Sequence, residues 1–322
     1  MQNLTPTSAS TPAMSRRLLF TIPSYGYLEP NFLAHGDFEQ GKTERKYFPD
    51  GERYLRILSD LWGRDVIVLG GTATDMDVLE VFDLASGIAR AGARSLAIVI
   101  PYFGYQTMER AVREGEVVVA KSRARLLSSI PSPEGGTRFF LFDLHTDGIE
   151  FYLDDRVLTR HIYGAPMVTK KIQERMGIGN TSFVLGACDA GRAKWVQSLA
   201  RDLHVEPAFV YKKRDSSSGV LAVTGVNADV RGKEVVVYDD MIRTGSSLVQ
   251  AAKSYLGAGA TKVHAIASHL VLPGDALESL RASGVFASIM GTDSHPGSQK
   301  LPKEDLVSIA PRLVECIERA AE

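Results

Sequence analysis

One stretch of the sequence combines a buried-strand pattern with two carboxylates and a loop rich in hydroxyl groups. Residues 235–238 are apolar and predict a buried parallel strand, Asp239 and Asp240 follow it, and a helical pattern begins at Leu248. The loop between them contains Thr244, Gly245, Ser246 and Ser247. Glycine permits a tight turn, and hydroxyls together with the unpaired N–H groups of a first helical turn can bind an anion.

A phosphate in this loop would place the sugar that carries it over the end of the strand. There Asp239 and Asp240 can accept hydrogen bonds from neighbouring ribose hydroxyls. The pattern therefore predicts a site for a pentose 5-phosphate. An ordinary strand–turn–helix with an acidic edge is the alternative, but the carboxylate pair, the hydroxyl loop and the apolar strand coincide here.

Strand and helix patterns alternate along the chain, which predicts parallel sheets covered by helices. In the first half the predicted strands are 53–57, 65–69, 95–100 and 138–142, with a helix near 78–91. In the second half they are 182–185, 208–211, 235–238 and 262–268, with helices near 193–203 and from 248. The predicted fold class is α/β, with mostly parallel sheets flanked by helices.

The two halves of the chain resemble each other weakly. Segment 63–68 resembles 232–237, and 91–95 resembles 258–262. We therefore predict a leader over 1–17, an N-terminal domain over 18–160 and a C-terminal domain over 161–322. Where the second copy has its carboxylates and hydroxyl loop, the first has Gly-Gly-Thr-Ala-Thr-Asp at 70–75, so only the second predicts a sugar-phosphate site.

Composition excludes several classes of protein. The 322 residues carry a formal net charge of −1 without a basic block, which argues against wholesale binding of nucleic acid or an anionic membrane. No apolar run approaches the roughly 18 residues of a membrane span. The only cysteines, Cys188 and Cys316, suit a reducing compartment. Residues 1–15 are rich in Ser, Thr and Pro and predict a disordered leader, with an organelle-targeting segment as the alternative.

Four motifs occur in order along the chain. They are Phe-Pro-Asp-Gly-Glu at 48–52, Ile-Pro-Tyr-Phe-Gly-Tyr at 100–105, Phe-Asp-Leu-His at 142–145 and the acidic loop that begins at Asp239. In this order and spacing they resemble the ribose-phosphate pyrophosphokinases (phosphoribosyl diphosphate synthetases), and the resemblance covers nearly everything from Lys46 to His269. It implies two tandem phosphoribosyltransferase-type domains. It also implies transfer of the diphosphoryl group of ATP, or another nucleoside triphosphate, to the C1 hydroxyl of ribose 5-phosphate, giving 5-phosphoribosyl 1-diphosphate and AMP.

The resemblance also implies roles for individual residues. The sugar phosphate would be bound by Asp239, Asp240, Arg243, Thr244, Gly245, Ser246 and Ser247. The nucleotide would be bound by Phe48, Asp50, Glu52, Glu109 and Arg110, the first three reaching it from a neighbouring subunit. Mg²⁺ would be held near the triphosphate by His145 and Asp189. Lys212 and Arg214, on a mobile loop after strand 208–211, would be the catalytic cations that stabilise charge on the transferred group.

Several residues depart from the common form of the family. Arg243 stands where that form has Asp in the sugar-phosphate loop, and Arg192 replaces the second Gly of the metal-site motif, so each adds a candidate phosphate contact. The segment from Gln106 to Val118 looks more like the divergent, plant-type class, which is associated with looser donor choice and no phosphate-dependent allostery. The preferred donor therefore stays open.

Two other functions remain open from the sequence. A phosphoribosyltransferase that consumes the activated sugar would share the sugar-phosphate loop, but would not need the 48–52 motif or a second domain. The second alternative is a catalytically silent paralogue that acts as a regulatory subunit. The presence of all four residues His145, Asp189, Lys212 and Arg214 argues against this alternative. The resemblance further implies a cytoplasmic homo-oligomer built from dimers, with a hexamer as one form, that binds ATP and ribose 5-phosphate but neither nucleic acid nor membrane.

Overall fold

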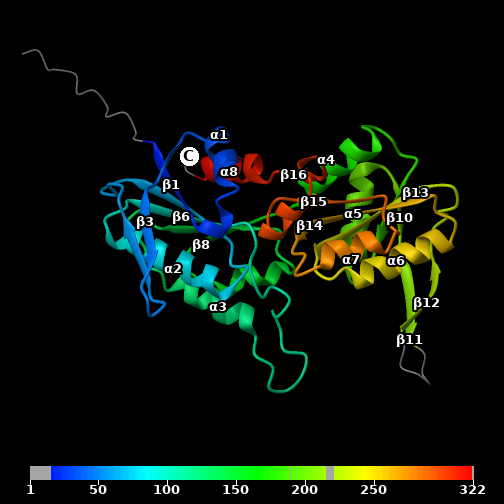
Figure 1. The fold of residues 1–322 in the computed structure, drawn as a ribbon, viewed down its shortest axis with the longest axis horizontal. Coiled ribbons are helices and arrows are strands. Elements are labelled where there is room, and N and C mark those ends of the chain that lie inside the picture. The colour runs from blue at the N-terminus through cyan, green and yellow to red at the C-terminus, as the bar shows by residue number, and fades with distance from the viewer. Residues whose placement is uncertain (1–15, 189, 215–220, 321–322) are drawn as a thin grey trace, which may run out of the picture.

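The computed structural model describes residues 16–188, 190–214 and 221–320, which form two α/β lobes side by side (Figure 1). Each lobe is built on a six-stranded sheet in which every strand pair is parallel. The strand orders are β2-β1-β5-β6-β7-β8 and β10-β9-β13-β14-β15-β16. Counted within each lobe, these are the same order, so the predicted pair of similar, mostly parallel α/β domains is confirmed.

The strands of the N-terminal sheet are β1 (Arg17–Thr21), β2 (Phe38–Gln40), β5 (Asp65–Leu69), β6 (Ser95–Ile100), β7 (Thr137–Phe142) and β8 (Leu158–Ile162). Those of the C-terminal sheet are β9 (Val184–Ala187), β10 (Glu206–Ala208), β13 (Glu234–Ile242), β14 (Lys262–Leu270), β15 (Ser288–Thr292) and β16 (Leu306–Val307). Short 3₁₀ helices span Pro23–Tyr25, Asp147–Tyr152, Ala190–Arg192, Pro296–Lys300 and Lys303–Asp305.

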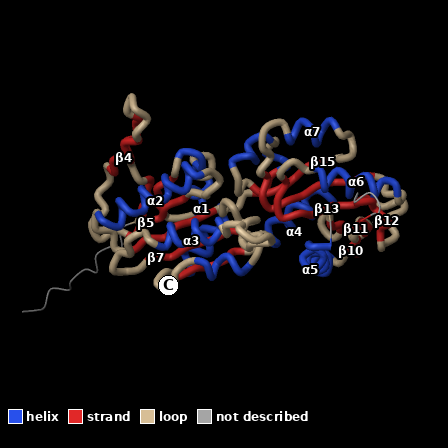
Figure 2. The backbone as a smooth tube through the Cα atoms, turned by 90° about the horizontal axis from the view of Figure 1, so that it is seen from below, coloured by secondary structure: helices blue, strands red, loops and turns tan. Residues whose placement is uncertain are grey.

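Helices cover both faces of each sheet (Figures 1 and 2). The N-terminal lobe has α2 (Asp75–Arg90) and α3 (Val119–Ser128) on one face, and α1 (Glu29–His35) and α8 (Ala310–Arg319) on the other. The C-terminal lobe has α4 (Ala165–Met176) with α5 (Ala193–Leu203), and α6 (Ser246–Gly257) with α7 (Ala276–Ala282). No helix in the described ranges is both long and apolar enough to cross a bilayer.

β13 shows why an uninterrupted apolar run makes a central strand here. Val235 and Val237 belong to the core beneath α6 and α7, whereas Val236 and Tyr238 belong to the core beneath α4 and α5. Because successive side chains of a strand point to opposite faces, a strand covered on both faces must be apolar at every position. The sequence pattern of β13 therefore encodes burial on both sides.

The last helix returns to the N-terminal lobe. Leu313, Val314 and Ile317 of α8 are buried in the same core as Leu18 and Phe20 of β1, and α8 contacts α1. Residues 309–317 thus complete the N-terminal core although they follow the last strand of the C-terminal sheet. The domain division at residues 160 and 161 stays a prediction. β8 spans that position within the N-terminal sheet, and α8, which follows it in sequence, also packs in the N-terminal lobe.

In each lobe an antiparallel hairpin is inserted, along the chain, between the strands that come second and third in sequence, which are β2 and β5 in the N-terminal lobe and β10 and β13 in the C-terminal lobe. It is formed by β3 (Thr43–Tyr47) and β4 (Arg53–Ile57) in the N-terminal lobe, and by β11 (Val210–Arg214) and β12 (Leu221–Val226) in the C-terminal lobe. The motif at 48–52 is the turn of the first hairpin, closed by the Phe48 N–H donating to the Glu52 carbonyl at 2.8 Å. The two hairpins occupy equivalent positions in the duplicated topology.

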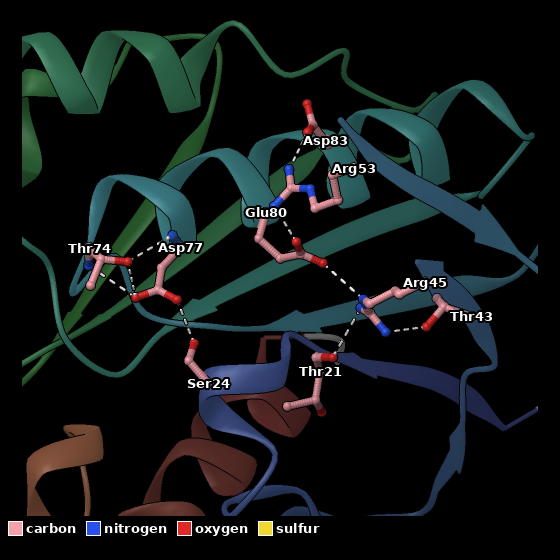
Figure 3. A network of polar contacts seen from close by, with 9 residues as sticks. All are labelled: Thr21, Ser24, Thr43, Arg45, Arg53, Thr74, Asp77, Glu80 and Asp83. Carbon is pink, nitrogen blue, oxygen red and sulfur yellow. Dashed lines mark hydrogen bonds and ion pairs between the residues drawn. The ribbon is translucent and has the colours of Figure 1, made fainter. Parts of the chain in front are cut away.

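Two arginines fasten the first hairpin to α2 (Figure 3). Arg45 Nε lies 2.9 Å from one carboxylate oxygen of Glu80, and Arg53 pairs with the other oxygen of Glu80 and, at 2.5 Å, with Asp83. The Glu80 side chain is only 8% exposed. The direction of the 48–52 turn is therefore tied to α2 through one buried carboxylate.

The two lobes meet along a seam of histidines and aromatic rings. His269 of β14 is fully buried, with its Nε2 2.9 Å from the carbonyl oxygen of Asp143 at the end of β7. The ring of Tyr102 packs edge-on against His269 and His295, with centroids 5.0 and 4.7 Å apart. Burial, followed by the charge of His269, lowers the pKa of His295 to about 4.

Glu80→Gln should destabilise the protein by about 2 kcal/mol, because two largely buried guanidinium groups lose their shared negative charge. Chemical denaturation measures the change. The matched control is Glu44→Gln, whose carboxylate is 43% exposed and lies 3.7 Å from Arg56, and which should cost about 0.5 kcal/mol or less. Equal effects of the two substitutions would contradict the fastening role of Glu80.

His295→Asn should flatten the loss of stability in acid. The histidine pKa is about 6.5 when unfolded and about 4 when folded, so the unfolded chain binds more protons between these values and stability falls as the pH drops. The variant should escape a loss of about 3 kcal/mol between pH 7 and pH 4, measured by denaturant unfolding across that range. The exposed His35→Asn is the control and should follow the parent protein.

Candidate active site

A cleft of about 820 Å³ lies between the lobes, at the C-terminal ends of the central strands. The N-terminal lobe contributes Thr107, Glu109, Arg110 and residues 145–147 to its lining, and the C-terminal lobe contributes Gly191, Arg192, Trp195 and residues 239–248. In parallel α/β sheets this edge is where ligands bind, because loops and helix N-termini converge there.

The carboxylate pair lies within β13 and not after it. The strand extends to Ile242, past the predicted end at residue 238, and Asp239 pairs in register with Ala267 of β14. Polar residues in a strand that is otherwise apolar suggested its end, yet the backbone ladder continues through them. Asp240 is 5% exposed, whereas Asp239 is partly open to the cleft.

Asp240 joins His145 and Arg192 across the two lobes. Its Oδ2 lies 2.6 Å from His145 Nδ1 and 2.5 Å from Arg192 Nη2, so both side chains can donate to this oxygen. Arg192 Nη2 also lies 2.5 Å from His145 Nδ1, so this ring nitrogen either donates to Asp240 or accepts from Arg192, and does not do both at once. The predicted metal ligand and the predicted sugar ligand are therefore brought together, and Arg192 holds them in one compact cluster.

This cluster makes the two carboxylates unequal. Burial and then the negative charge of Asp240 raise the pKa of Asp239. Burial alone would raise the pKa of Asp240 too, but the hydrogen bond from His145 and the charge of Arg192 outweigh it and lower that pKa. The negative charge of the pair is thus held mainly on Asp240, while Asp239 takes up a proton more readily.

The first turn of α6 opens into the cleft without a side-chain cap. Gly245 precedes the helix with φ +74° and, having no side chain, supplies no cap to the first turn. The helix begins at Ser246, two residues before the predicted start. Unpaired N–H groups at a helix N-terminus attract anions, and Thr244, Ser246 and Ser247 line the same part of the cleft.

The equivalent turn of the N-terminal lobe is closed. Thr74 caps α2 by accepting from the Asp77 N–H at 3.1 Å, and the Asp77 carboxylate accepts from the Thr74 N–H and from Ser24 (Figure 3). The hydroxyl of Tyr25 fills the space beside Gly71, where a Cβ atom would lie only 2.1 Å from it. The start of α2 is therefore not open in the way that the start of α6 is.

Other predicted residues separate into two groups. Arg243, Glu109 and Arg110 line the cleft with the acid pair, and Arg243 donates to Thr107 of the N-terminal lobe at 2.8 Å. In contrast, Phe48, Asp50 and Glu52 lie at the exposed tip of the first hairpin and are absent from the cleft lining of the described chain. Within one chain they do not meet the other predicted nucleotide-binding residues.

The predicted catalytic residues are described only in their backbone. Lys212 and Arg214 belong to β11, which pairs with β12 in a two-stranded ribbon. The predicted strand 208–211 is divided, because β10 ends at Ala208 and joins the sheet while β11 starts at Val210 and leaves it. The side chains of Lys212 and Arg214, and the whole of Asp189, lie outside the described part of the structure.

Sequence reasoning missed some residues of the cleft. Thr107 and Trp195 line it, as do Thr146 and Asp147 directly after His145. The last two could have been included because they continue the strand end that carries His145. Thr107 and Trp195 carry no sequence signal, since only the meeting of the lobes brings them to the cleft.

Comparison with protein families assigns both lobes. Residues 17–130 match the N-terminal domain of ribose phosphate pyrophosphokinase, and residues 166–282 match the phosphoribosyl transferase domain. These two matches fall in the two lobes and leave α8 outside both.

Similar proteins cover nearly the whole chain. A ribose-phosphate pyrophosphokinase of Rhodopirellula baltica is 33% identical, with 91% of each chain covered. One from Synechococcus elongatus is 30% identical, over 97% of this chain and 93% of that protein. The crystal structure of phosphoribosylpyrophosphate synthetase from Mycobacterium smegmatis superposes with a TM-score of 0.82 at 25% identity, over 95% of this chain and 99% of that one.

Gly245→Ala should destabilise the protein by about 2 to 4 kcal/mol. The positive φ disfavours an L side chain, and the new Cβ would lie 2.3 Å from a methyl group of Leu280. The same change at Gly257, at the end of α6, meets no atom within 4 Å and should be neutral or slightly stabilising. Chemical denaturation compares the two, and a small cost at residue 245 would contradict the constraint.

Proposed function

The chain belongs to the ribose-phosphate pyrophosphokinase family, and we propose that it is an active member whose cleft carries out the family reaction with the residues described above. The reaction transfers the diphosphoryl group of ATP to the C1 hydroxyl of ribose 5-phosphate. The C1 oxygen bonds to the β-phosphorus, the bond from that phosphorus to the bridging oxygen of the α-phosphate breaks, AMP leaves, and the hydroxyl proton is released.

The observation that carries the proposal is the open start of α6 beside the acid pair. The 5-phosphate would be bound by the first-turn N–H groups and by the hydroxyls of Thr244, Ser246 and Ser247. The sugar would then lie over the end of β13. Because Asp239 is partly exposed and takes up a proton more readily than Asp240, the pair can offer both an acceptor and a donor to the ribose hydroxyls.

The nucleotide would occupy the side of the cleft formed by the N-terminal lobe, where Glu109 and Arg110 lie. The hairpin tip with Phe48, Asp50 and Glu52 cannot complete this site within its own chain, which supports a contribution from a second copy. We therefore propose a homo-oligomer in which the hairpin of one subunit serves the cleft of another. Its direction, fixed by Glu80, would then matter to the neighbour.

Lys212 and Arg214 would supply positive charge to the oxygens that gain charge during the transfer. Diphosphoryl transfer needs little covalent help from a protein, and alignment and electrostatic stabilisation provide most of the rate. The position of these residues on a ribbon that leaves the sheet supports this role, since such a ribbon can close over a ligand without disturbing the core.

The described residues do not form a magnesium site on their own. Among them no group of three or more His, Cys, Asp or Glu side chains is placed to hold a metal, and the guanidinium of Arg192 lies against His145 Nδ1. We propose that Mg²⁺ is bound mainly by the triphosphate, whose oxygens it prefers, with His145 and Asp189 as candidate protein ligands. Both cysteines are buried and fit a reducing compartment, and we propose the cytoplasm.

Lys212→Ala should lower turnover at least about 100-fold while leaving the affinity for ribose 5-phosphate within about twofold, because the lost cation acts on the transferred group. Asp240→Asn should instead weaken ribose 5-phosphate binding. Turnover is measured as AMP release from ATP and ribose 5-phosphate, with the masses of the products resolved. The affinity for ribose 5-phosphate is measured by calorimetry. Lys213→Ala, an equal change of charge one residue away, is the control.

The same assay separates the family reaction from the other two functions. Pyrophosphate release that requires a base and the activated sugar, without AMP release, would identify a phosphoribosyltransferase. Binding of ribose 5-phosphate without any turnover would identify a silent paralogue. Normal turnover of the Lys212→Ala protein would show that the proposed catalytic cation is wrong.

A further inference from the structure

A long loop of the N-terminal lobe, residues 105–118, carries Glu109 and Arg110 into the cleft. The N-terminal lobe holds both ends of this loop. Tyr105 donates to Asp75 at the start of α2, and the Ala120 N–H of α3 donates to the Met108 carbonyl at 3.4 Å. The loop is also hydrogen-bonded to the C-terminal lobe, because Arg243 of that lobe donates to Thr107 Oγ1 of the loop at 2.8 Å.

Arg243 brings an uncompensated positive charge to this contact. The residue is exposed, follows β13 directly, and forms no ion pair with any described carboxylate. Its partners Thr107 and Tyr102 carry no negative charge, so the charge of the guanidinium is not neutralised by either of them. Two residues later Gly245 begins the uncapped turn of α6, so the charge lies at the entrance of the proposed phosphate site.

A guanidinium group carries five N–H donors in a rigid plane and can serve two acceptors at once. Nη2 donates to Thr107, and the guanidinium also hydrogen-bonds the Tyr102 side chain, which still leaves donors for a phosphate oxygen at the start of α6. Arg243 would then connect the anion in one lobe to the loop of the other. A lysine presents all its donors from one nitrogen, so both acceptors would have to lie within hydrogen-bond distance of that single atom, whereas the guanidinium spreads its donors over three nitrogens.

From this geometry we propose that Arg243 couples the two substrates: a sugar phosphate bound at α6 fixes the 105–118 loop through Arg243 and Thr107, and thereby strengthens nucleotide binding. The proposal rests on the proposed function, because it assumes that the cleft binds both ligands. Coupling of this kind is reciprocal, so the nucleotide must strengthen sugar-phosphate binding by the same factor. Arg243 and Thr107 are positioning residues in this scheme.

Calorimetry on the full chain can measure the coupling without turnover. The Kd of ribose 5-phosphate is determined alone and with saturating α,β-methylene ATP, which cannot transfer its diphosphoryl group. The ratio of the two values should lie at about 5 to 150 in the parent protein. Thr107→Val, which keeps the size of the side chain and removes the acceptor, should bring the ratio to within twofold of 1. Thr107→Ser, which keeps the acceptor, should restore it.

Arg243 should respond differently from Thr107. Arg243→Ala should weaken ribose 5-phosphate binding even without nucleotide, because it removes a phosphate contact, and should also abolish the coupling. Arg243→Lys should retain part of the sugar-phosphate affinity and lose the coupling, since the shorter lysine, whose donors all leave one nitrogen, does not span both acceptors as the guanidinium does. Thermal melting of each variant without ligand verifies that it is folded.

The possible failures are distinguishable. If the parent protein binds neither ligand, the proposed function itself is wrong. If it binds both with a ratio near 1, or if Thr107→Val keeps the parent ratio, the function stands and the coupling through Arg243 is overturned.

Discussion

The first turn of α6 is the constraint on which the cleft depends. Gly245 allows the chain to pass from β13 into α6 within three residues, and no side chain caps the turn that follows. The N–H groups of that turn therefore stay available to an anion, at a fixed distance from the carboxylates at the end of β13. One strand–loop–helix unit thus sets the spacing between the open helix turn and the carboxylate pair.

The duplicated lobes show how one topology serves two purposes. In the N-terminal lobe a threonine cap and the ring of Tyr25 close the turn that the C-terminal lobe leaves open. The hairpins at equivalent positions differ as well: one is fastened to α2 by a buried carboxylate, and the other carries the basic residues Lys212 to Arg214. Duplication supplied the framework, and a few side chains divided the chemistry between the copies.

Elements with a regular apolar pattern could be predicted from the sequence. The strand 95–100 and the helix 193–203 have the predicted bounds, because their periodicity is not interrupted at either end. The end of β13 could not be predicted, since its carboxylates look like a strand end and only pairing with β14 shows otherwise. The break after Ala208 was also missed, because an apolar run does not reveal that its second half leaves the sheet.

Prediction of the candidate site from the sequence is likewise limited to features that are local in the chain. Asp239, Asp240 and the hydroxyl loop could be predicted because they are neighbours in sequence and their chemistry is local. The contacts of Arg192 with His145, and of Arg243 with Thr107, could not, because each joins residues from different lobes. A sequence shows that an arginine is present in a phosphate loop, but packing alone decides what it touches.

The return of α8 has a consequence for synthesis on the ribosome. A nascent chain emerges from its N-terminus, and domains usually fold in that order. Here the N-terminal lobe lacks Leu313, Val314 and Ile317 in its core until every strand of the C-terminal sheet has left the exit tunnel. The apolar face that α8 covers therefore stays exposed, or is bound by a chaperone, until the C-terminal sheet has been synthesised. The N-terminal lobe is synthesised first, but its core is completed last.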